Sequence, residues 1–589
     1  FPAIRRWAVY ICPANKKTVK KIVMNRRDAE KQLKEKFGFD KFHDEQWKTI
    51  QHVLNGERVL LIERTGFGKS LCYQFPAAIF PGITIIFSPL IALMRDQVKK
   101  LNSLGISARC LNSEQNTAEN SQILKDAVNG KIKILYIAPE RLESTAWTKA
   151  VKEMKLSMVV VDEAHCISVW GHDFRPAFRR IIDLVRTLPV EIPVLATTAT
   201  ATPVVERDIA AQVSGKVRVI RGKLMRQNLQ LYVQRVSFQD DKLIWLAQHL
   251  NRLEGSGIIY VGTRKEVVRI TDWLKQNHIT AAGYHAGLSA AERQRIEAGM
   301  MENRWKCVVS TNALGMGIDK PDIRFIIHTQ IPQSPIHYYQ EIGRAGRDGD
   351  TGKVILLYHR EDVKLPKMFI NFSKPAIHQY EKFIRLLKEE SMTEAKLTAS
   401  MKASENAIRS IKSDLLDQQI IRETTKGQKK LLHYIPTGPD LDAGIIDRLR
   451  EVRFAELDQM VAYAETGESR MKFLCRYLGD LDEMELKNCD NSGIRPLPLL
   501  DDTRLENMLR KFNGQPEEEE DTRALIEQTV QQRIRSFAKF PKMDLPPRIE
   551  FDPEEDMIQR NAEKDFLYYM EKRELNKDLY TSRFEDDED

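Results

Sequence analysis

Short apolar runs, each followed by an amphipathic stretch, constrain the fold of this chain more than any other feature of its sequence. Five such runs lie between residues 37 and 215. Buried parallel strands form continuous apolar runs, and successive parallel strands are joined by a crossover that is usually a helix. The pattern therefore predicts a parallel α/β sheet with strands at Val59–Ile62, Ile83–Phe87, Ile132–Ile137, Met158–Val161 and Val194–Ala196.

A second series of the same kind occupies residues 216–374. A chain of 589 residues is too long for one hydrophobic core. We therefore expect a second α/β domain of similar size, with strands at Gly257–Val261, Cys307–Ser310, Phe325–His328 and Val354–Leu357.

Beyond residue 374 the strand pattern gives way to helical spacing. Two short helices are predicted at Met392–Lys402 and Ser404–Leu416, followed by two small β runs around Lys426–Lys429. This order is typical of a winged helix, which we assign to residues 375–440. Residues 441–495 are predicted to be helical. Residues 496–589 are rich in Pro and charge and carry no motif, and we expect loosely ordered helices and linker there.

Charge is distributed unevenly along the chain. Residues 1–36 hold eleven Lys/Arg and three Asp/Glu, whereas residues 496–589 hold fifteen basic and twenty-five acidic residues. A basic N-terminal extension on a basic body favours a polyanionic partner such as nucleic acid, although a solvated charged surface explains the same balance. The acidic C-terminal extension is expected to avoid nucleic acid and is a candidate for contacts with protein partners.

The composition favours an intracellular chain without a membrane span. No apolar run reaches 18 residues, and seven scattered Cys fit a reducing compartment better than a disulfide framework. The first residues, Phe1–Arg6, lack an initiator Met and a signal-peptide core, so we expect a truncated start.

A glycine-rich turn after the first predicted strand indicates a phosphate site. Backbone N–H groups of such a turn surround phosphate oxygens at a helix N-terminus. A lysine there reaches the β and γ phosphates, and a hydroxyl binds Mg²⁺. Glu63 stands where the general pattern has its first Gly, and an ordinary strand–helix turn is the alternative. The candidate ligands are Thr65, Gly66, Gly68, Lys69 and Ser70.

Two carboxylates follow the strand Met158–Val161. Asp162 is positioned to hold Mg²⁺ through its water, and Glu163 to orient or deprotonate an attacking water. Acidic residues at a strand end are often helix caps. Because they follow a Gly-Lys-Ser turn by about ninety residues within one βαβ series, we favour the catalytic interpretation.

The second domain supplies positive charge. Arg344 and Arg347 stand three apart among small residues, and on one helix face both guanidinium groups would enter a cleft and neutralise the transferring phosphoryl group. A pair of surface arginines beside a turn is the alternative. Gly343 and Gly346 allow close approach of the backbone, which favours the catalytic role.

These residues resemble the RecQ DNA helicases of helicase superfamily 2 between Phe37 and Tyr358, with a weaker likeness to Ser492. The resemblance implies two tandem RecA-like P-loop domains, followed by a mostly helical C-terminal region. It also implies ATP and Mg²⁺ as cofactors. The matching segments are Phe37–Phe39 with Gln46, Ser88–Gln97, Ala138–Leu142, the DEAH box Asp162–His165, Thr198–Thr202, Tyr284–Leu288, Ser310–Pro321 and Tyr339–Gly349.

The resemblance assigns roles to single residues. It implies that Phe39 stacks on adenine and that Gln46 hydrogen-bonds the base. Arg347 would be the arginine finger, assisted by Gln340 and Arg344.

The segment Cys166–Pro176 resembles the aromatic-rich loop of this family. Aromatic faces stack on bases, and a guanidinium contacts phosphate or a π face. A packed aromatic turn is the alternative, but it explains a histidine and an arginine together poorly. We assign single-stranded DNA contacts to Trp170, His172, Phe174 and Arg175.

The chain departs from the family in three places. Arg64 and Phe67 stand where the phosphate motif usually has Pro and Gly, and His43 stands where the adenine motif usually has Arg. In the zinc-binding subdomain the expected Cys positions read Ser469, Leu486 and Ser492, and only Cys489 remains. Tetrahedral zinc needs four N or S ligands. We therefore predict a degenerate, zinc-free subdomain at residues 441–495, held by packing.

The function implied is an ATP-dependent DNA helicase that moves 3′ to 5′ on single-stranded DNA and unwinds duplex, forked or branched DNA in recombination and repair. Its location would be the nucleus in a eukaryote, or the cytoplasm and nucleoid in a bacterium. Two alternatives remain. One is an RNA helicase or double-strand translocase, and the other is a DNA-tethering scaffold whose core does not hydrolyse ATP.

Overall fold

The structure is a computed structural model that describes residues 21–112, 114–168, 176–213, 215–314, 320–426, 429–481, 486–495 and 497–514. The four residues predicted to bind DNA, Trp170, His172, Phe174 and Arg175, lie outside these ranges. Residues 315–319 of the segment Ser310–Pro321, residues 1–20 of the basic extension, and residues 496 and 515–589 of the acidic extension also lie outside them. Within these ranges, none of the helices has both the length and the apolar character of a membrane span.

The first lobe is built on a seven-stranded sheet whose strands are all parallel. Both faces of this sheet are buried. Leu60 and Ile62, on the strand formed by residues 58–62, lie in one core, and Val59 and Leu61 of the same strand lie in the other. This explains the uninterrupted apolar runs of the sequence. In sheet order the strands are β3 (Ala108–Leu111), β4 (Ile134–Ile137), β2 (Ile83–Phe87), β5 (Leu156–Val161), β6 (Val194–Thr198), β1 (Arg58–Ile62) and β7 (Val217–Arg221).

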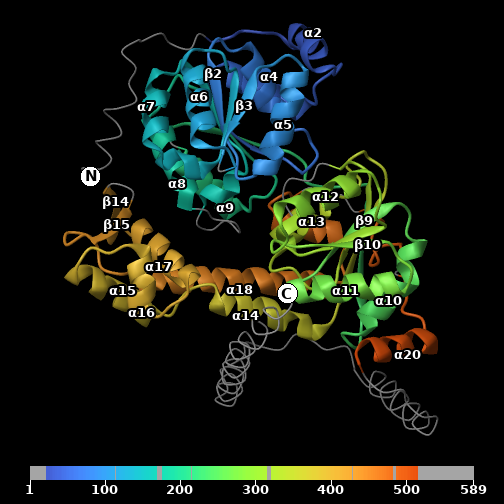
Figure 1. Ribbon diagram of the computed structural model, residues 1–589. Helices are drawn as coiled ribbons and strands as arrows, with labels where there is room; N and C mark the ends of the chain where they lie inside the picture. Colours follow the sequence, from blue (N-terminus) through green and yellow to red (C-terminus); the bar gives the residue numbers. More distant parts are fainter. Residues whose placement is uncertain are drawn as a thin grey trace, which may run out of the picture. The chain divides into compact units, whose positions relative to one another are not determined.

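Two groups of helices cover the two faces of this sheet (Figure 1). One face is covered by α2 (Arg26–Phe37), α3 (Asp44–Leu54), α4 (Leu71–Ile79) and α5 (Ile91–Ser103). The other is covered by α6 (Thr117–Val128), α7 (Thr145–Glu153), α8 (Pro176–Thr187) and α9 (Pro203–Gln212).

The first lobe extends beyond the range 37–215 expected for it. Helix α2 buries Ala29, Leu33 and Phe37 in the core that also contains Val59 and Leu61. Ile22 and Met24 pack on the same core, so the basic extension is part of the lobe from residue 22 onward. At the other end β7 pairs with β1 along its whole length, so the sheet continues to residue 221.

The second lobe contains a six-stranded parallel sheet. In order its strands are β10 (Ala281–Tyr284), β11 (Cys307–Ser310), β9 (Ser256–Tyr260), β12 (Ile323–His328), β13 (Gly352–Tyr358) and β8 (Leu229–Arg235). One face packs against α10 (Asp241–His249) and α11 (Arg264–Gln276), and the other against α12 (Ala290–Met301) and α13 (Pro335–Ile342).

Helices dominate the rest of the described chain. After α14 (Lys364–Phe372), a separate core forms among three helices and an antiparallel hairpin. These elements are α15 (Ile377–Glu389), α16 (Glu394–Met401), α17 (Glu405–Asp417), β14 (Ile421–Lys426) and β15 (Lys429–Tyr434). The long helix α18 (Ala443–Glu465) then leads to α19 (Arg470–Tyr477), and both pack on the second lobe (Figure 1).

The segment with the expected zinc positions adds backbone contacts to the second sheet. Leu231 of the edge strand β8 donates its N–H to Asn488 O at 3.0 Å and accepts from Asp490 N at 3.1 Å. Arg470 makes a two-pronged ion pair with Asp490, with Nη2 2.8 Å from Oδ2. Cys489 Sγ lies 3.0 Å from Ser492 Oγ. In the described part of the chain, no three His, Cys, Asp or Glu side chains gather as metal ligands do.

Part of the acidic extension packs on the second lobe. Trp245 Nε1 donates to Leu497 O at 2.8 Å, and the Gln248 amide bonds Leu500. Helix α20 (Thr503–Phe512) then buries Leu509 against α10 and α11. The chain was expected to be loosely ordered from residue 496, but residues 497–513 form part of the second lobe.

Candidate active site

The turn between β1 and α4 places a lysine among backbone carbonyls. Gly66 and Gly68 adopt φ angles of +81° and +87°, which other residues rarely adopt. Lys69 Nζ donates to Glu63 O at 2.8 Å and Arg64 O at 3.1 Å. Burial lowers the pKa of Lys69, and the carboxylates of Glu163 and Asp162 oppose that shift. The ammonium of Lys69 is thus held by carbonyls of the turn, within electrostatic reach of the Asp162 and Glu163 carboxylates that follow β5.

Glu63, the departure from the usual phosphate motif, is buried rather than exposed to the cavity. Its carboxyl occupies the space that a side chain at Gly222 would need, since a Cβ placed there would overlap Oε1. Burial raises the pKa of Glu63 to about 7. The departure therefore leaves the phosphate-facing side of the turn intact.

Asp162 and Glu163 follow β5 directly and face Lys69. Asp162 Oδ1 accepts a hydrogen bond of 2.7 Å from Thr197 Oγ1 on the neighbouring strand β6. Burial, with a further contribution from Glu163, raises the pKa of Asp162 to about 6. Glu163 has a positive φ of 53°, a conformation that is uncommon outside glycine and is concentrated at functional sites.

His165 connects Glu163 to the segment Thr198–Thr202. Its Nδ1 lies 3.2 Å from Glu163 Oε2 and 3.0 Å from Thr198 Oγ1. Burial opposes ionisation of Glu163, but His165 and Lys69 outweigh it, so the pKa of Glu163 lies below its usual value. Glu163 is therefore the more acidic member of the pair and a suitable group to orient a water.

The expected adenine segment lies beside the phosphate turn. Phe39 is half exposed at the rim of the cavity. Gln46 is buried and donates from Nε2 to Phe67 O at 3.1 Å, while its Oε1 accepts from His43 N at 3.0 Å. Gln46 thus joins the adenine segment to the phosphate turn, and the ring of His43 lies 5.5 Å from that of Phe67 between centroids.

Arg344 and Arg347 do not lie on one face of a helix, contrary to the expectation from their spacing. Helix α13 ends at Ile342, and both arginines lie in the following turn. Gly346 has a φ of +55°, which breaks helical geometry. The two side chains nevertheless line the same cavity as Lys69, because the turn folds back toward the first lobe.

The turn of the second lobe is packed directly against the phosphate turn of the first. A Cβ on Gly343 would lie 2.5 Å from Thr65 Oγ1, so only glycine fits at this contact. The Arg347 side chain lies against Gly66, and Gln340 Nε2 donates to Thr200 Oγ1 at 2.9 Å. The cavity enclosed by these groups has a volume of roughly 470 Å³.

The residues that line this cavity fit a magnesium nucleotide. Among the described residues, Thr65 Oγ1 and Arg344 Nε are buried polar atoms without a hydrogen-bond partner. A phosphate chain supplies acceptors for both. Ser70 precedes α4 and lines the same cavity as Asp162, and oxygen ligands of this kind suit a hard cation.

A second cavity lies at the carboxyl edge of the second sheet and was not predicted. It has a volume of roughly 570 Å³, and its polar lining follows directly from the ends of β9, β11 and β12. Polar residues immediately after an apolar strand were the sequence signal for it. The lining includes Thr263, Arg264, Thr311, Asn312, Gln330 and His337.

Two family models match the chain. Residues 43–208 match the DEAD/DEAH box helicase model, and residues 241–349 match the helicase conserved C-terminal domain. These ranges contain the phosphate turn, the acidic pair and both arginines. They correspond to the two sheets described above.

Three curated relatives align with the same part of the chain. ATP-dependent DNA helicase RecQ of Bacillus subtilis (strain 168) is 41% identical over 348 residues, which are 59% of this chain and 58% of the relative. The relative named "Probable ATP-dependent DNA helicase RecS", from the same organism, is 37% identical over 366 residues, 61% of this chain and 73% of the relative. RecQ-like DNA helicase BLM of Xenopus laevis is 39% identical over 358 residues, 58% of this chain and 26% of the relative.

Proposed function

This chain belongs to the RecQ family of helicases, and we propose that it is an ATP-dependent DNA helicase. It spans only 58% of the length of the RecQ relative from Bacillus subtilis. The observation that carries the proposal is that Lys69 and the acidic pair of one lobe line a single cavity with Arg344 and Arg347 of the other. Hydrolysis in such a cavity is coupled to the relative position of the lobes.

Different residues of the first lobe bind the phosphates, hold Mg²⁺ and orient the attacking water. Lys69 and the backbone N–H groups of the turn bind the phosphate chain, while Ser70 and Asp162 hold Mg²⁺. Bound Mg²⁺ neutralises phosphate charge as it develops. Glu163 orients the attacking water and accepts its proton, with His165 holding the carboxylate in place.

The arginines complete this site from the second lobe. Arg347 is the arginine finger and Arg344 assists it, because guanidinium groups stabilise the charge that spreads over the transferred phosphoryl group. Phe39 and Gln46 bind the adenine. Loss of the γ-phosphate removes the shared ligand of the two lobes, and the lobes separate.

Single-stranded DNA and forked or branched DNA are the proposed substrates, with movement from 3′ to 5′ along the single strand. Trp170, His172, Phe174 and Arg175 would stack on bases and contact the DNA backbone. The polar cavity of the second lobe, with Thr263, Arg264 and Thr311, offers donors suited to phosphates. We take α15–α17 and the β14–β15 hairpin as a winged helix that meets the duplex.

An ATPase assay with no nucleic acid, single-stranded DNA, duplex DNA and RNA tests the proposal. Stimulation by single-stranded DNA, together with unwinding of a fork that has a 3′ tail, supports it. A larger response to RNA or to blunt duplex would replace it with the corresponding alternative. Tight DNA binding without any hydrolysis would indicate a tether.

The DNA-sensing role has its own test in Trp170→Ala. This variant is expected to keep the basal ATPase and lose its stimulation by single-stranded DNA. An unchanged stimulation ratio would remove Trp170 from the proposed DNA contacts.

A further inference from the structure

The connection between the two sheets contacts the turn that carries Arg344 and Arg347. Residues 222–228 join β7 to β8, and within them Arg226 is 5% exposed. Its guanidinium donates to Gly343 O at 3.3 Å, to Ala345 O at 2.9 Å and to Gly346 O at 3.0 Å. One side chain thus binds three carbonyls of the arginine turn, which we define as residues 343–349.

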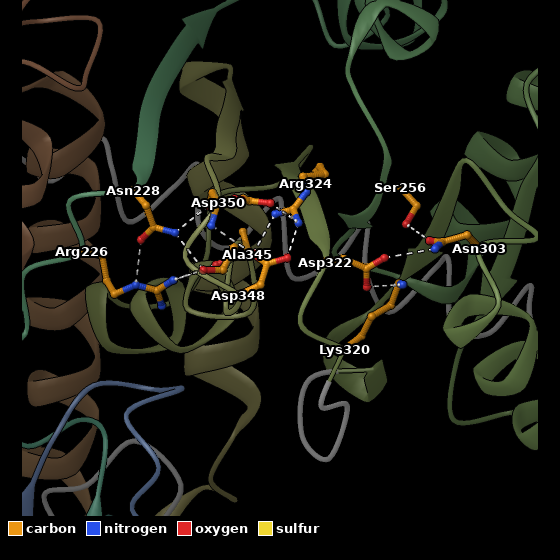
Figure 2. A network of polar contacts seen from close by, with 11 residues as sticks. Arg226, Asn228, Ser256, Asn303, Lys320, Asp322, Arg324, Ala345, Asp348 and Asp350 are labelled. Atoms are coloured by element: carbon orange, nitrogen blue, oxygen red, sulfur yellow. Dashed lines mark hydrogen bonds and ion pairs between the residues drawn. The ribbon is translucent and has the colours of Figure 1, made fainter. Parts of the chain in front are cut away.

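Asn228 reinforces this contact from the same side (Figure 2). Its Nδ2 donates to Gly346 O at 2.8 Å and to Asp350 O at 2.7 Å, and its Oδ1 accepts from Arg226 Nε at 3.3 Å. Each end of the arginine turn is therefore held through its backbone. These contacts do not depend on the identity of the side chains in the turn.

The other side of the arginine turn faces the phosphate turn. Gly343 is packed on Thr65, and the Arg347 side chain lies against Gly66. The carbonyls point toward Arg226 while the guanidinium groups of Arg344 and Arg347 line the nucleotide cavity. A displacement of the turn on the Arg226 side would consequently move both arginines relative to the nucleotide.

The segment around Arg226 also contacts the first lobe. Met225 O accepts from Nη1 of Arg64 in the phosphate turn at 3.4 Å. Leu224 N donates to Asp480 Oδ2 at 2.6 Å, and Leu224 O accepts from Tyr339 Oη on α13. Three consecutive residues therefore contact the phosphate turn, α13 and the arginine turn.

We propose that Arg226 is a positioning residue, which fixes Arg344 and Arg347 at the nucleotide by holding the backbone of the arginine turn. The inference rests on the proposed ATP hydrolysis. Arginine suits this role because its planar donors reach several carbonyls at once in a fixed geometry, whereas lysine presents a single ammonium. A misplacement of about 1 Å at a catalytic group costs on the order of 100-fold in rate.

Arg226→Gln and Arg226→Lys test the proposal, with kcat and KM for ATP measured on the full chain with single-stranded DNA. We expect Arg226→Gln to lower kcat about 10- to 100-fold and to leave KM within about threefold, because the turn holds the transition state rather than the ground state. Arg226→Lys should retain an intermediate rate. Arg269→Gln is the matched control, since Arg269 is a partly buried arginine of the second lobe that bonds Asp240 at 2.7 Å.

A double-mutant cycle with Arg347→Ala separates positioning from general destabilisation. If Arg226 acts through the arginines, Arg226→Gln lowers kcat by a much smaller factor in the Arg347→Ala background than in the wild type, and the remaining loss reports on Arg344. The proposal would be overturned if the loss of kcat in the double variant equals the product of the two single losses. It would also be overturned if Arg226→Gln has the same kcat as Arg269→Gln. A KM increase with unchanged kcat would also overturn it.

The ATPase activity of the wild type distinguishes a failure of the positioning role from a failure of the proposed function. Hydrolysis without any response to nucleic acid refutes the DNA-dependent function, and the cycle is then measured on the basal rate. A wild type that hydrolyses no nucleotide under any condition refutes both.

Discussion

Gln340 of the second lobe donates a hydrogen bond of 2.9 Å to Thr200 of the first. Thr200 N in turn donates to Thr198 Oγ1 at 3.2 Å, and the same oxygen lies 3.0 Å from His165 Nδ1. His165 contacts Glu163, the group proposed to orient the water. A continuous set of polar contacts thus runs from α13 to the hydrolytic carboxylate.

Because this connection crosses between the lobes, Gln340→Ala and Thr200→Val should each lower the DNA-stimulated kcat about tenfold. The double variant should lose little more than either single one, since both remove the same hydrogen bond. Steady-state ATPase with saturating single-stranded DNA provides the measurement. Gln248→Ala, whose amide bonds Leu500 on the far face of the second lobe, is the control and should keep wild-type turnover. Additive losses would show that Gln340 and Thr200 act separately.

Substitution of Lys69 in the phosphate turn should also abolish the DNA-stimulated ATPase activity. Lys69→Ala removes the ammonium that now bonds Glu63 O and Arg64 O, and should abolish DNA-stimulated ATPase, with a loss of at least about 100-fold. Lys99→Ala, at an exposed position of α5, should have no effect. Full turnover by Lys69→Ala would refute the assignment of this turn to phosphate binding.

The central strands could be predicted from the sequence, whereas the edge strands could not. The strands missed were β3, β7, β8 and β10, which are the outer strands of the two sheets. An edge strand has one neighbour and less burial, so its sequence needs no continuous apolar run. In β7, Arg218 and Val219 are exposed, and the segment does not stand out from the surrounding polar chain.

The sequence motifs predicted which residues line the site better than they predicted the backbone structure that positions those residues. The spacing of Arg344 and Arg347 suggested a helix face, but the glycines at 343 and 346 end the helix and form a turn. The fit of Glu63 against Gly222 and the bonds from Arg226 to the arginine turn depend on residues more than a hundred positions apart or on backbone atoms. Neither leaves a periodic signal in a single sequence.

Glu63 predicts a pH dependence of stability. Burial raises its folded-state pKa from 4.5 to about 7, so between these values the folded chain retains a proton that the unfolded chain releases. Stability contributed by this group is therefore full below pH 4.5 and falls as pH rises to about 7. Glu63→Gln removes this titration. The free energy of unfolding of the variant, measured relative to that of the wild type, should therefore be higher at pH 8 than at pH 4.5 by on the order of 2 kcal/mol.

Thermal unfolding of both proteins across this pH range checks the prediction. The difference in midpoint between Glu63→Gln and the wild type should grow as pH rises. A difference that does not change with pH would mean that Glu63 is ionised in the folded chain throughout.

The last prediction concerns the segment that resembles a zinc-binding subdomain. Arg470 and Asp490 are 4% and 8% exposed, and their ion pair joins α19 to the strand contact at Leu231. Removing one member leaves a buried charge unpaired, which typically costs about 3–5 kcal/mol. Arg470→Ala should therefore lower the unfolding midpoint strongly. Arg476→Ala, which breaks the more exposed pair with Glu468, should cost less than about 1 kcal/mol.

Metal analysis completes this test, because only Cys489 of the expected thiolate positions remains in the sequence. Purified protein should contain no stoichiometric zinc, and a chelator should leave the unfolding midpoint unchanged. A metal that stabilises this segment would instead bind the folded chain more tightly than the unfolded chain. Adding that metal would then raise the unfolding midpoint. One zinc per chain, or rescue of Arg470→Ala by added zinc, would show that ligands other than the four aligned positions hold this segment together.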